Sequence, residues 1–344
     1  MHKLIKNPSV SVVIPCYNEE KYIEACVRSV FNGDYPLQKL EVIVVDGESE
    51  DQTHTILSSL RNEYAGLNVL KNPKKVTPVS LNIGLKKATG DVKMILGAHS
   101  EIAVDFISKN ISALSANPQA GCAGGLIENV YKNKTAKLIG RAMASPFGVG
   151  NATFRIGGKS GFVDTVAFGA YRREVFEKIG YFDEELVRNQ DDEFNFRMLK
   201  NGFKIYFSTA IKCKYFVRSS YSKLKKQYYQ YGYWKVYVNK KHKAVTTLRQ
   251  VFPALFTAGL FLGFILSFLH PVFLYIWLTT IFAYLSAAVL FAMRAQCGKI
   301  QGLTGVLGVF FILHLYYGAG YIAGVFDFFI RNKKPAKKHT SISR

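Results

Sequence analysis

Apolar and polar positions in the first hundred residues follow two alternating patterns. Short apolar runs of strand length are separated by segments in which apolar residues recur at helical spacing. Because the strands are nearly continuous apolar runs, we expect an α/β fold with a mostly parallel sheet covered by helices. The pattern predicts strands at 9–14, 41–45, 68–70 and 92–96, and helices at 19–31, 51–63 and 78–87.

The later part of the chain is dominated by apolar residues. No charged residue occurs from Val251 to Met293, a run about twice the roughly 20 residues that a membrane-spanning helix needs. His270-Pro271 interrupts the run, so we expect a hairpin of two transmembrane helices, at about 251–270 and 271–293. A further apolar stretch covers 303–330. The alternative is a buried hairpin in a soluble core, but uncharged runs of this length are rare there.

The topology of the third apolar stretch stays open. Basic residues prefer the cytoplasmic side of a membrane. A hairpin returns the loop 294–302, with Arg294 and Lys299, to the side of the N-terminal domain. A third full span would then place the six positive charges of 331–344 outside. Three alternatives follow. The preference of basic residues for the cytoplasmic side fails here, or 303–330 is a re-entrant segment, or its helix breaks near Gly318-Ala319-Gly320.

The positive charge is concentrated at the borders of this apolar region. The chain carries a net charge of +21, which by itself raises nucleic acid as a partner. Residues 1–211 hold 26 Lys and Arg against 23 Asp and Glu, whereas 212–250 hold eleven positive residues and no acid. No nucleic-acid-binding motif is present, so we expect no nucleic acid partner. A basic, aromatic segment beside a membrane helix is typical of an interfacial helix on anionic lipid.

These patterns predict four regions: a catalytic domain at 1–211, an interfacial segment at 212–250, a transmembrane segment at 251–330 and a basic tail at 331–344. The five cysteines have no paired short spacing, which disfavours a zinc cluster or a disulfide framework. The N-terminus lacks a long apolar core and a small-residue cleavage site, so no signal peptide is expected.

Ligands of open parallel sheets bind beyond the carboxyl ends of the strands. The polar residues there are Pro15-Cys16-Tyr17-Asn18-Glu19 after the first strand, Asp46 to Asp51 after the second, and Gly97-Ala98-His99 after the fourth. The chain has neither GxGxxG nor GxxxxGK[ST], which removes the main support for dinucleotide and P-loop sites.

These strand ends, together with Gln190-Asp191-Asp192-Glu193, resemble the motifs PxYNE, VVDGxSxD, DxD and EDxE of family-2 glycosyltransferases with the GT-A fold. The resemblance covers roughly residues 8–240. The stretch from Val163 to Ile205 is similar to the subgroup typified by succinoglycan-biosynthesis glucosyltransferases.

The resemblance implies a nucleotide site at the first two strand ends. Asp46 would accept the ring N–H of a uracil, and the pocket wall would consist of Pro15, Tyr17, Asn18 and Glu19. The alternative for Asp46 is a turn residue, because Asp-Gly favours turns. Ser49 and Asp51 are expected in structural roles, as loop and helix-cap residues.

At the fourth strand end the resemblance implies a divalent metal. Gly97 stands where the family carries its first Asp, so His99 is the candidate ligand. Imidazole suits Mn²⁺ better than Mg²⁺. The alternatives are a His that only hydrogen-bonds at the strand end, and activity that does not need a metal.

The acidic segment at 190–193 is expected to supply the catalytic base. A carboxylate would take the proton from the acceptor hydroxyl as it attacks the anomeric carbon, in a single displacement with inversion. The resemblance favours Asp191, with Asp192 as the competing choice. Glu193 and Arg197 are spaced for a structural ion pair. The resemblance also implies that Asp164 and Gln190 border the acceptor and donor sugar.

The segment from Gln230 to Trp234 matches the QxxRW motif of processive relatives, except that Tyr233 replaces the Arg. Gln230 and Trp234 are candidates for the acceptor site, or plain membrane anchors. The loss of this Arg and the small number of apolar segments favour addition of one sugar over polymerisation. The resemblance implies a UDP-sugar as donor and a polyprenyl-diphosphate-linked glycan of exopolysaccharide, capsule or O-antigen as acceptor. The enzyme would sit in the inner (plasma) membrane with its catalytic domain in the cytoplasm. The alternatives are a catalytically weak scaffold and a processive synthase.

Overall fold

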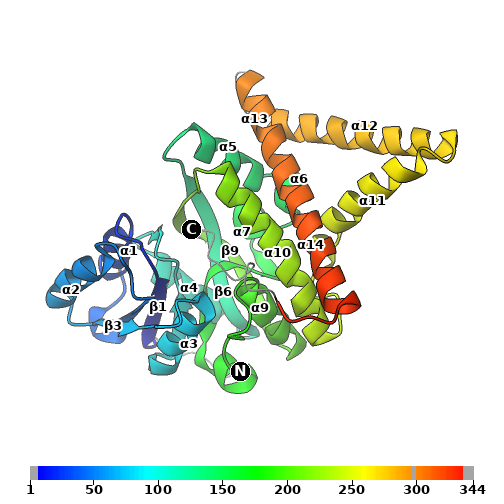
Figure 1. Cartoon of the computed structure of the whole chain (residues 1–344). Coiled ribbons are helices and arrows are strands. Elements are labelled where there is room, and N and C mark those ends of the chain that lie inside the picture. The colour runs from blue at the N-terminus through cyan, green and yellow to red at the C-terminus, as the bar shows by residue number, and fades with distance from the viewer. Residues whose placement is uncertain (1–6, 296–299, 336–344) are drawn as a thin grey trace. The chain divides into compact units, whose positions relative to one another are not determined.

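The structure is a computed structural model that describes residues 7–295 and 300–335. Within these residues the chain packs into two compact units. The first unit comprises 7–130 and 152–216, and the second comprises 131–151 and 217–335. The two units are shown in Figure 1, and each is described by itself below.

The first unit alternates strands and helices as the sequence predicts up to residue 96, with ends that differ by at most four residues. Its elements are β1 (Val10–Cys16), α1 (Ile23–Phe31), η1 (Leu37–Lys39), β2 (Leu40–Asp46), α2 (Thr53–Glu63), β3 (Leu67–Lys71), α3 (Thr77–Lys87), β4 (Val92–Ile95), β5 (Ser100–Ile102), α4 (Phe106–Ala116), β6 (Ala120–Val130), α7 (Thr153–Ile156), β7 (Gly161–Val163), β8 (Ala167–Arg172), α8 (Arg173–Ile179), α9 (Gln190–Lys200) and β9 (Lys204–Phe216).

All these strands form one twisted sheet in the order β3-β2-β1-β4-β8-β6-β9-β5, with β7 paired to β9. The strands β3, β2, β1 and β4 are parallel, as expected. From β4 onward the sheet is mixed, because β8 runs antiparallel to both of its neighbours. The carboxyl ends of β1 and β2 are in register, with Cys16 opposite Asp46.

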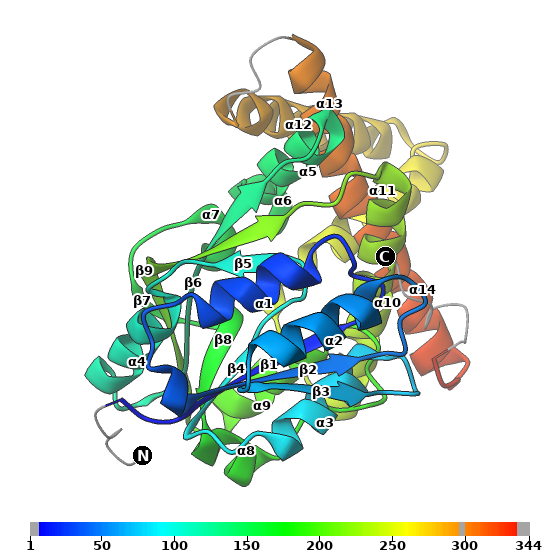
Figure 2. The same ribbon diagram turned by 90° about the vertical axis from the view of Figure 1, so that its left-hand side faces the viewer.

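Helices cover both faces of this sheet, and each face has its own apolar core. On one face, α1, α2 and α4 bury residues such as Val27, Leu57 and Leu114 against the strands (Figure 2). On the other face, α3, α8 and α9 bury residues such as Leu85 and Phe194. The helices hold the strand ends in place, which is the requirement for a site built on loops.

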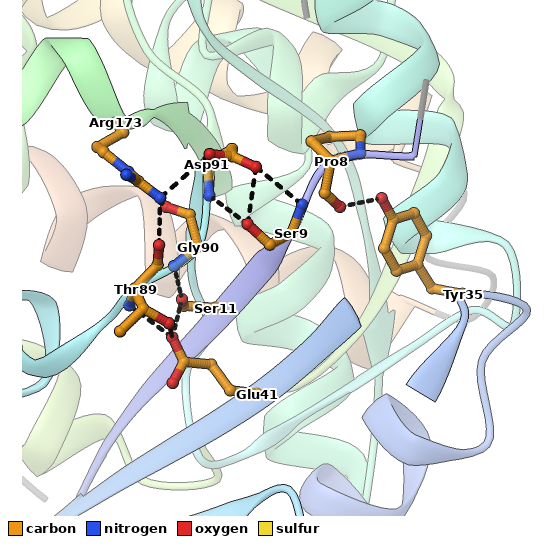
Figure 3. Close-up of polar contacts among 9 residues, drawn as sticks. All are labelled: Pro8, Ser9, Ser11, Tyr35, Glu41, Thr89, Gly90, Asp91 and Arg173. Atoms are coloured by element: carbon orange, nitrogen blue, oxygen red, sulfur yellow. Dashed lines mark hydrogen bonds and ion pairs between the residues drawn. The ribbon is translucent and has the colours of Figure 1, made fainter. Parts of the chain in front are cut away.

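The amino ends of β1, β2 and β4 are joined by a polar cluster (Figure 3). The Glu41 carboxylate accepts hydrogen bonds from the Ser11 hydroxyl and from the backbone N–H and hydroxyl of Thr89, at 2.6 and 2.9 Å. The Asp91 carboxylate accepts from the N–H and hydroxyl of Ser9, at 3.1 and 2.7 Å. This end of the sheet is therefore closed by hydrogen bonds within the fold.

The second unit is helical. Its elements are α5 (Lys134–Met143), α6 (Pro146–Val149), α10 (Tyr221–His242), η2 (Leu248–Gln250), α11 (Phe252–Leu266), α12 (Pro271–Arg294), α13 (Ile300–Phe311), η3 (Ile312–Tyr316), α14 (Tyr317–Val325) and η4 (Phe326–Ile330). Three helical stretches among the described residues have the length and apolar composition to cross a membrane: 248–266, 271–294 and 302–330. The predicted hairpin matches α11 and α12, with its turn at His270-Pro271.

Of the alternatives left open for the third apolar stretch, a break near Gly318-Ala319-Gly320 does not occur, because α14 runs through this segment. Its glycines instead allow close packing. A Cβ on Gly320 would lie 2.0 Å from the Tyr229 carbonyl oxygen of α10, and one on Gly318 would lie 2.0 Å from the Thr257 hydroxyl of α11. Figure 1 shows α10 and α14 side by side, as these contacts require.

The two units differ from the regions that the sequence suggested. The predicted boundary after residue 211 falls inside β9. Residues 131–151, counted with the catalytic domain in the sequence analysis, pack with the second unit. Lys299, Cys297 and most of the basic tail lie outside the described residues.

Candidate functional site

The loops that follow β1 and β2 are locked together at the carboxyl end of the sheet. The backbone N–H of Asn18 donates to the Ser49 hydroxyl at 2.9 Å, and the Asn18 side chain accepts from the N–H of Glu50 at 2.8 Å. The N–H of Glu19 donates to the Thr53 hydroxyl at 2.8 Å. The residues predicted to line a nucleotide pocket are thus fixed relative to each other without a ligand.

Asp46 lies at the centre of this arrangement and is only 4% exposed. Its Oδ1 accepts from the N–H and hydroxyl of Ser49, at 3.2 and 2.6 Å, in a local turn. Asp51 accepts from the N–H of Thr53, the first residue of α2, at 3.0 Å. The structural roles expected for Ser49 and Asp51 are therefore present, and Ser49 in addition orients the Asp46 carboxylate.

Two residues that sequence reasoning missed lie beside Tyr17. The Tyr17 hydroxyl contacts the Glu50 carboxylate at 3.3 Å, and Lys75 Nζ contacts the same oxygen at 2.9 Å. Lys75 Nζ also lies 5.5 Å from the centroid of the Tyr17 ring. Lys75 belongs to the loop between β3 and α3 and has a positive φ of 55°. No motif marks it, because only the fold brings this loop to the first strand end.

The turn after β4 holds His99 in a defined position. The Gly97 carbonyl accepts from the N–H of Ser100 at 3.1 Å and from the Cys26 thiol at 3.5 Å. Burial raises the pKa of Cys26 to about 12, so its thiol stays protonated and can donate. His99 Nδ1 lies 3.4 Å from the Glu19 carboxylate. Glu19, predicted as pocket wall, thus faces the candidate metal ligand.

These residues do not form a metal site of their own. Gly97 has no side chain to bind an ion, and Glu101 contacts Lys214 at 3.6 Å. Within residues 7–295 and 300–335 no group of three His, Cys, Asp or Glu side chains is placed to hold an ion. We therefore derive no chemical step through a metal, and His99 as a ligand of Mn²⁺ or Mg²⁺ stays a prediction.

An aromatic ring occupies the space beside Gly97. A Cβ at position 97 would lie 3.0 Å from Cε1 of Phe168. Phe168 lies on β8 and has a φ of 51°, a left-handed conformation that is costly for an aromatic residue. Strained backbone of this kind is found at functional sites when the surrounding structure imposes it. The turn after β4 therefore lacks the carboxylate that the family carries at position 97 and has the ring of Phe168 beside that position.

The predicted catalytic carboxylates lie in the first turn of α9. Asp191 is exposed and Asp192 is half-buried. The Asp191 carboxylate accepts from the N–H of Asp192 at 2.9 Å, and Asn189, the residue just before the helix, has a φ of 61°. Glu193 and Arg197 form the expected structural ion pair, at 2.6 Å.

The loop with Asp164 is tied to the same helix. Asp164 follows β7, and the side chain of Asn195 on α9 donates to the hydroxyl of the next residue, Thr165, at 3.0 Å. Gln190 is the first residue of α9. The structure thus connects the predicted sugar-binding residues with the helix that carries Asp191.

The two remaining candidates belong to the second unit. Gln230 and Trp234 lie on α10, and each is only 1% exposed. Tyr233, which stands where processive relatives carry Arg, donates to Asp327 at 2.9 Å. An acceptor role for Gln230 and Trp234 stays a prediction.

Comparisons with known proteins agree with the motifs. The model of glycosyl transferase family 2 matches residues 11–180, and that of glycosyl transferase family group 2 matches residues 117–292. The chain is 32% identical over 230 residues to a Methanococcus voltae protein, covering 65% of this chain and 71% of the relative. That relative is dolichyl N-acetyl-alpha-D-glucosaminyl phosphate 3-beta-D-2,3-diacetamido-2,3-dideoxy-beta-D-glucuronosyltransferase.

A second relative aligns over nearly the whole chain. The succinoglycan biosynthesis protein ExoA of Rhizobium meliloti is 25% identical over 330 residues, which is 94% of this chain and 97% of that protein. Among solved structures, a Pyrobaculum calidifontis mannosyltransferase in complex with GDP-Man and Mn²⁺ has a TM-score of 0.58 at 19% identity, covering 94% of this chain and 88% of that one. The S. aureus TarS structure with UDP-GlcNAc has a TM-score of 0.53 at 18% identity, covering 94% and 92%. These likenesses confirm the predicted GT-A fold.

Proposed function

Because the chain belongs to glycosyltransferase family 2, we propose that it is a membrane-anchored, inverting hexosyltransferase. The donor is a UDP-sugar, and the acceptor is a glycan on a polyprenyl phosphate or diphosphate. One sugar is added per acceptor during synthesis of exopolysaccharide, capsule or O-antigen. The names of the two relatives, one with a dolichyl phosphate and one in succinoglycan biosynthesis, support this choice of acceptor and pathway.

The observation that carries this proposal is the buried Asp46 at the end of β2, enclosed by the loop with Tyr17, Asn18 and Glu19. Its Oδ1 is already bound by Ser49, which turns the carboxylate into a fixed acceptor. A uracil ring offers one N–H donor for such a carboxylate, and the Tyr17 ring offers an apolar surface. A rigid, pre-formed acceptor favours specific binding of the base.

In the proposed reaction Asp191 accepts the proton of the acceptor hydroxyl. The hydroxyl oxygen forms a bond to the anomeric carbon while the bond from that carbon to the donor diphosphate breaks, and UDP leaves with the electron pair. Asp191 suits this role because it is exposed at the start of α9 and can meet an incoming acceptor. Its neighbour Asp192 is less exposed and donates its backbone N–H to Asp191.

The membrane part of the proposal rests on the three long apolar helices. We place the chain in the inner (plasma) membrane with the first unit in the cytoplasm, where nucleotide sugars are made. The exposed basic residues of 212–250 would then contact anionic lipid headgroups. Protease accessibility of the first unit in sealed inside-out and right-side-out vesicles tests this orientation.

The activity is tested by incubating the full-length protein, in lipid nanodiscs, with a panel of UDP-sugars and lipid-linked acceptors. UDP release together with one hexose mass increment on the acceptor is the expected result. A ladder of increments would identify a processive synthase instead. Addition of Mn²⁺ or Mg²⁺ in separate samples tests the predicted metal dependence.

A catalytically weak scaffold is the second candidate, and Gly97 with Phe168 beside it is the observation that favours it. In that case UDP binds but no sugar is transferred to any acceptor, with or without Mn²⁺. If the protein binds UDP but releases no UDP from any UDP-sugar, it is the scaffold. If it releases UDP from one of them, it is the enzyme.

A further inference from the structure

One arginine beside the fourth strand end has no polar partner for its charge among the residues that the structure describes. Arg155 lies on α7, and its guanidinium lies over the rings of Phe154 and Tyr215, with centroid distances of 5.3 and 5.5 Å. Its Nη1 is buried and makes no hydrogen bond with any residue that the structure describes. No ion pair of its side chain occurs among those residues either. Buried charged donors are nearly always hydrogen-bonded, so a guanidinium without a hydrogen-bond partner among the described residues still has donors to offer to an acceptor.

The ring under Arg155 also contacts the candidate site. Tyr215, on β9, meets the ring of His99 edge-on at 5.2 Å, and the ring of Phe168 lies 6.5 Å away. His99 in turn contacts Glu19. Arg155 is therefore one aromatic ring away from the turn after β4. This is the turn where Gly97 replaces the expected carboxylate.

The local charge balance at this turn differs from that of a metal-binding strand end. The carboxylate at position 97 is missing, the ring of Phe168 fills its place, and an unpaired cation lies on the adjacent ring. A carboxylate would attract a cation, whereas a guanidinium with free N–H groups attracts an anion directly. Arginine is well suited to phosphate oxygens because its planar fork can donate two parallel hydrogen bonds.

We propose that Arg155 binds a phosphate group of the substrate through its guanidinium and offsets negative charge at the reacting centre. This inference rests on the proposed glycosyl transfer. The phosphate belongs either to the donor diphosphate, whose charge rises as UDP leaves, or to the lipid-linked acceptor. Both present the same chemistry to a guanidinium, and the experiment below separates them.

The test uses the full-length protein in nanodiscs with Arg155→Gln and Arg155→Lys. Arg28→Gln is the matched control, because Arg28 is a half-buried arginine paired with Glu24 and Glu63 on helices α1 and α2. Binding of inorganic pyrophosphate, UDP and uridine is measured by calorimetry. The KM for the acceptor and kcat are measured with the active UDP-sugar. Circular dichroism melting confirms that each variant is folded.

The proposal expects Arg155→Gln to weaken pyrophosphate binding by about ten-fold or more, as for loss of a charge-assisted hydrogen bond. Uridine binding stays unchanged. Arg155→Lys recovers part of the affinity, because it restores the charge without the fork. If the donor supplies the phosphate, UDP binding weakens in parallel; if the acceptor supplies it, UDP binding is unchanged and the acceptor KM rises.

Unchanged pyrophosphate binding in Arg155→Gln would overturn the proposal, as would an equal loss of uridine and pyrophosphate affinity. A similar loss in Arg28→Gln would also overturn it, because any positive charge would then suffice. Failure of the proposed function is a different result, in which the wild-type protein transfers no sugar from any UDP-sugar. The pyrophosphate measurement does not depend on that outcome.

Discussion

The two ends of the sheet in the first unit use polar residues in opposite ways. At the amino end, Glu41 and Asp91 accept several hydrogen bonds each, and Arg173 donates to the Gly90 carbonyl and to Asp91, both at 3.1 Å (Figure 3). At the carboxyl end, Arg155 Nη1 is buried without a hydrogen-bond partner in the described part of the chain, and Asp191 is exposed on its helix. Polar groups satisfied within the fold contribute stability, whereas groups left ready for a ligand contribute function.

The comparison predicts that substitutions at the two ends have separable effects. Changes at the carboxyl end lower activity and leave the free energy of unfolding nearly unchanged. Changes at the amino end lower the free energy of unfolding and leave the turnover of the folded enzyme unchanged. The predictions below run from the largest expected effect to the smallest.

The largest effect is expected for Asp191→Asn. An amide cannot accept the proton of the acceptor hydroxyl, so kcat falls by about 10²–10⁴-fold. The melting temperature stays within a few degrees of the wild type, because Asp191 is exposed. Steady-state sugar transfer together with calorimetric melting measures both quantities. The companion variant Asp192→Asn is expected to retain most activity. If Asp192→Asn instead loses more activity than Asp191→Asn, the catalytic base is Asp192.

Asp46→Asn is expected to weaken UDP binding by roughly 10–100-fold, the loss of a hydrogen bond to a charged group. The bonds from Ser49 to Oδ1 can persist with an amide oxygen, so the fold is retained. Calorimetric titration with uridine is the sharpest measurement, because uridine carries the base without the phosphates. Equal uridine affinity in wild type and variant would remove Asp46 from the base site.

At the opposite end, Glu41→Gln is expected to lower the free energy of unfolding by about 1–3 kcal/mol. The substitution weakens the bonds from Ser11 and Thr89 but touches no predicted site residue. Chemical denaturation of the full chain measures the loss, and kcat per folded molecule should equal that of the wild type. A fall in kcat without a fall in stability would contradict the division between the two ends.

The smallest effect concerns pH. Burial alone would raise the pKa of Glu41, but the hydrogen bonds from Ser11 and Thr89 outweigh it and lower the pKa below its usual value. A lowered pKa in the folded state stabilises the protein above the unfolded pKa of about 4.3, and this contribution is lost as the pH falls through the folded pKa. The stability difference between wild type and Glu41→Gln should therefore be constant near pH 7 and shrink below about pH 4. A stability difference that stays constant down to pH 3 would show that it does not come from the lowered pKa of Glu41.

The sequence predicted the first half of the sheet well because each element there is signalled locally. The apolar runs of β1, β2 and β4 and the helical spacing of α1 and α3 depend on neighbours in the chain. The strands β8 and β9 were not predicted, because their pairing depends on partners far away in sequence. Arg155 and Lys75 were missed for the same reason, since neither lies in a motif and both reach the strand ends only through the fold.

The glycines of the last apolar stretch show the same limit. A break at Gly318 and Gly320 was one of the alternatives left open for this stretch, since glycine lowers helix stability. In the structure they allow α14 to approach α11 and α10 closely, which no local pattern reveals.

By itself the sequence determined the α/β class, the family motifs and the long apolar helices, because these follow from the period of apolar residues and from short contiguous motifs. The tertiary structure alone decided which polar side chains the fold satisfies and which it leaves without a partner. Hydrogen-bond partners such as Glu41 with Thr89, or their absence around Arg155 Nη1 among the described residues, depend on segments that only folding brings together.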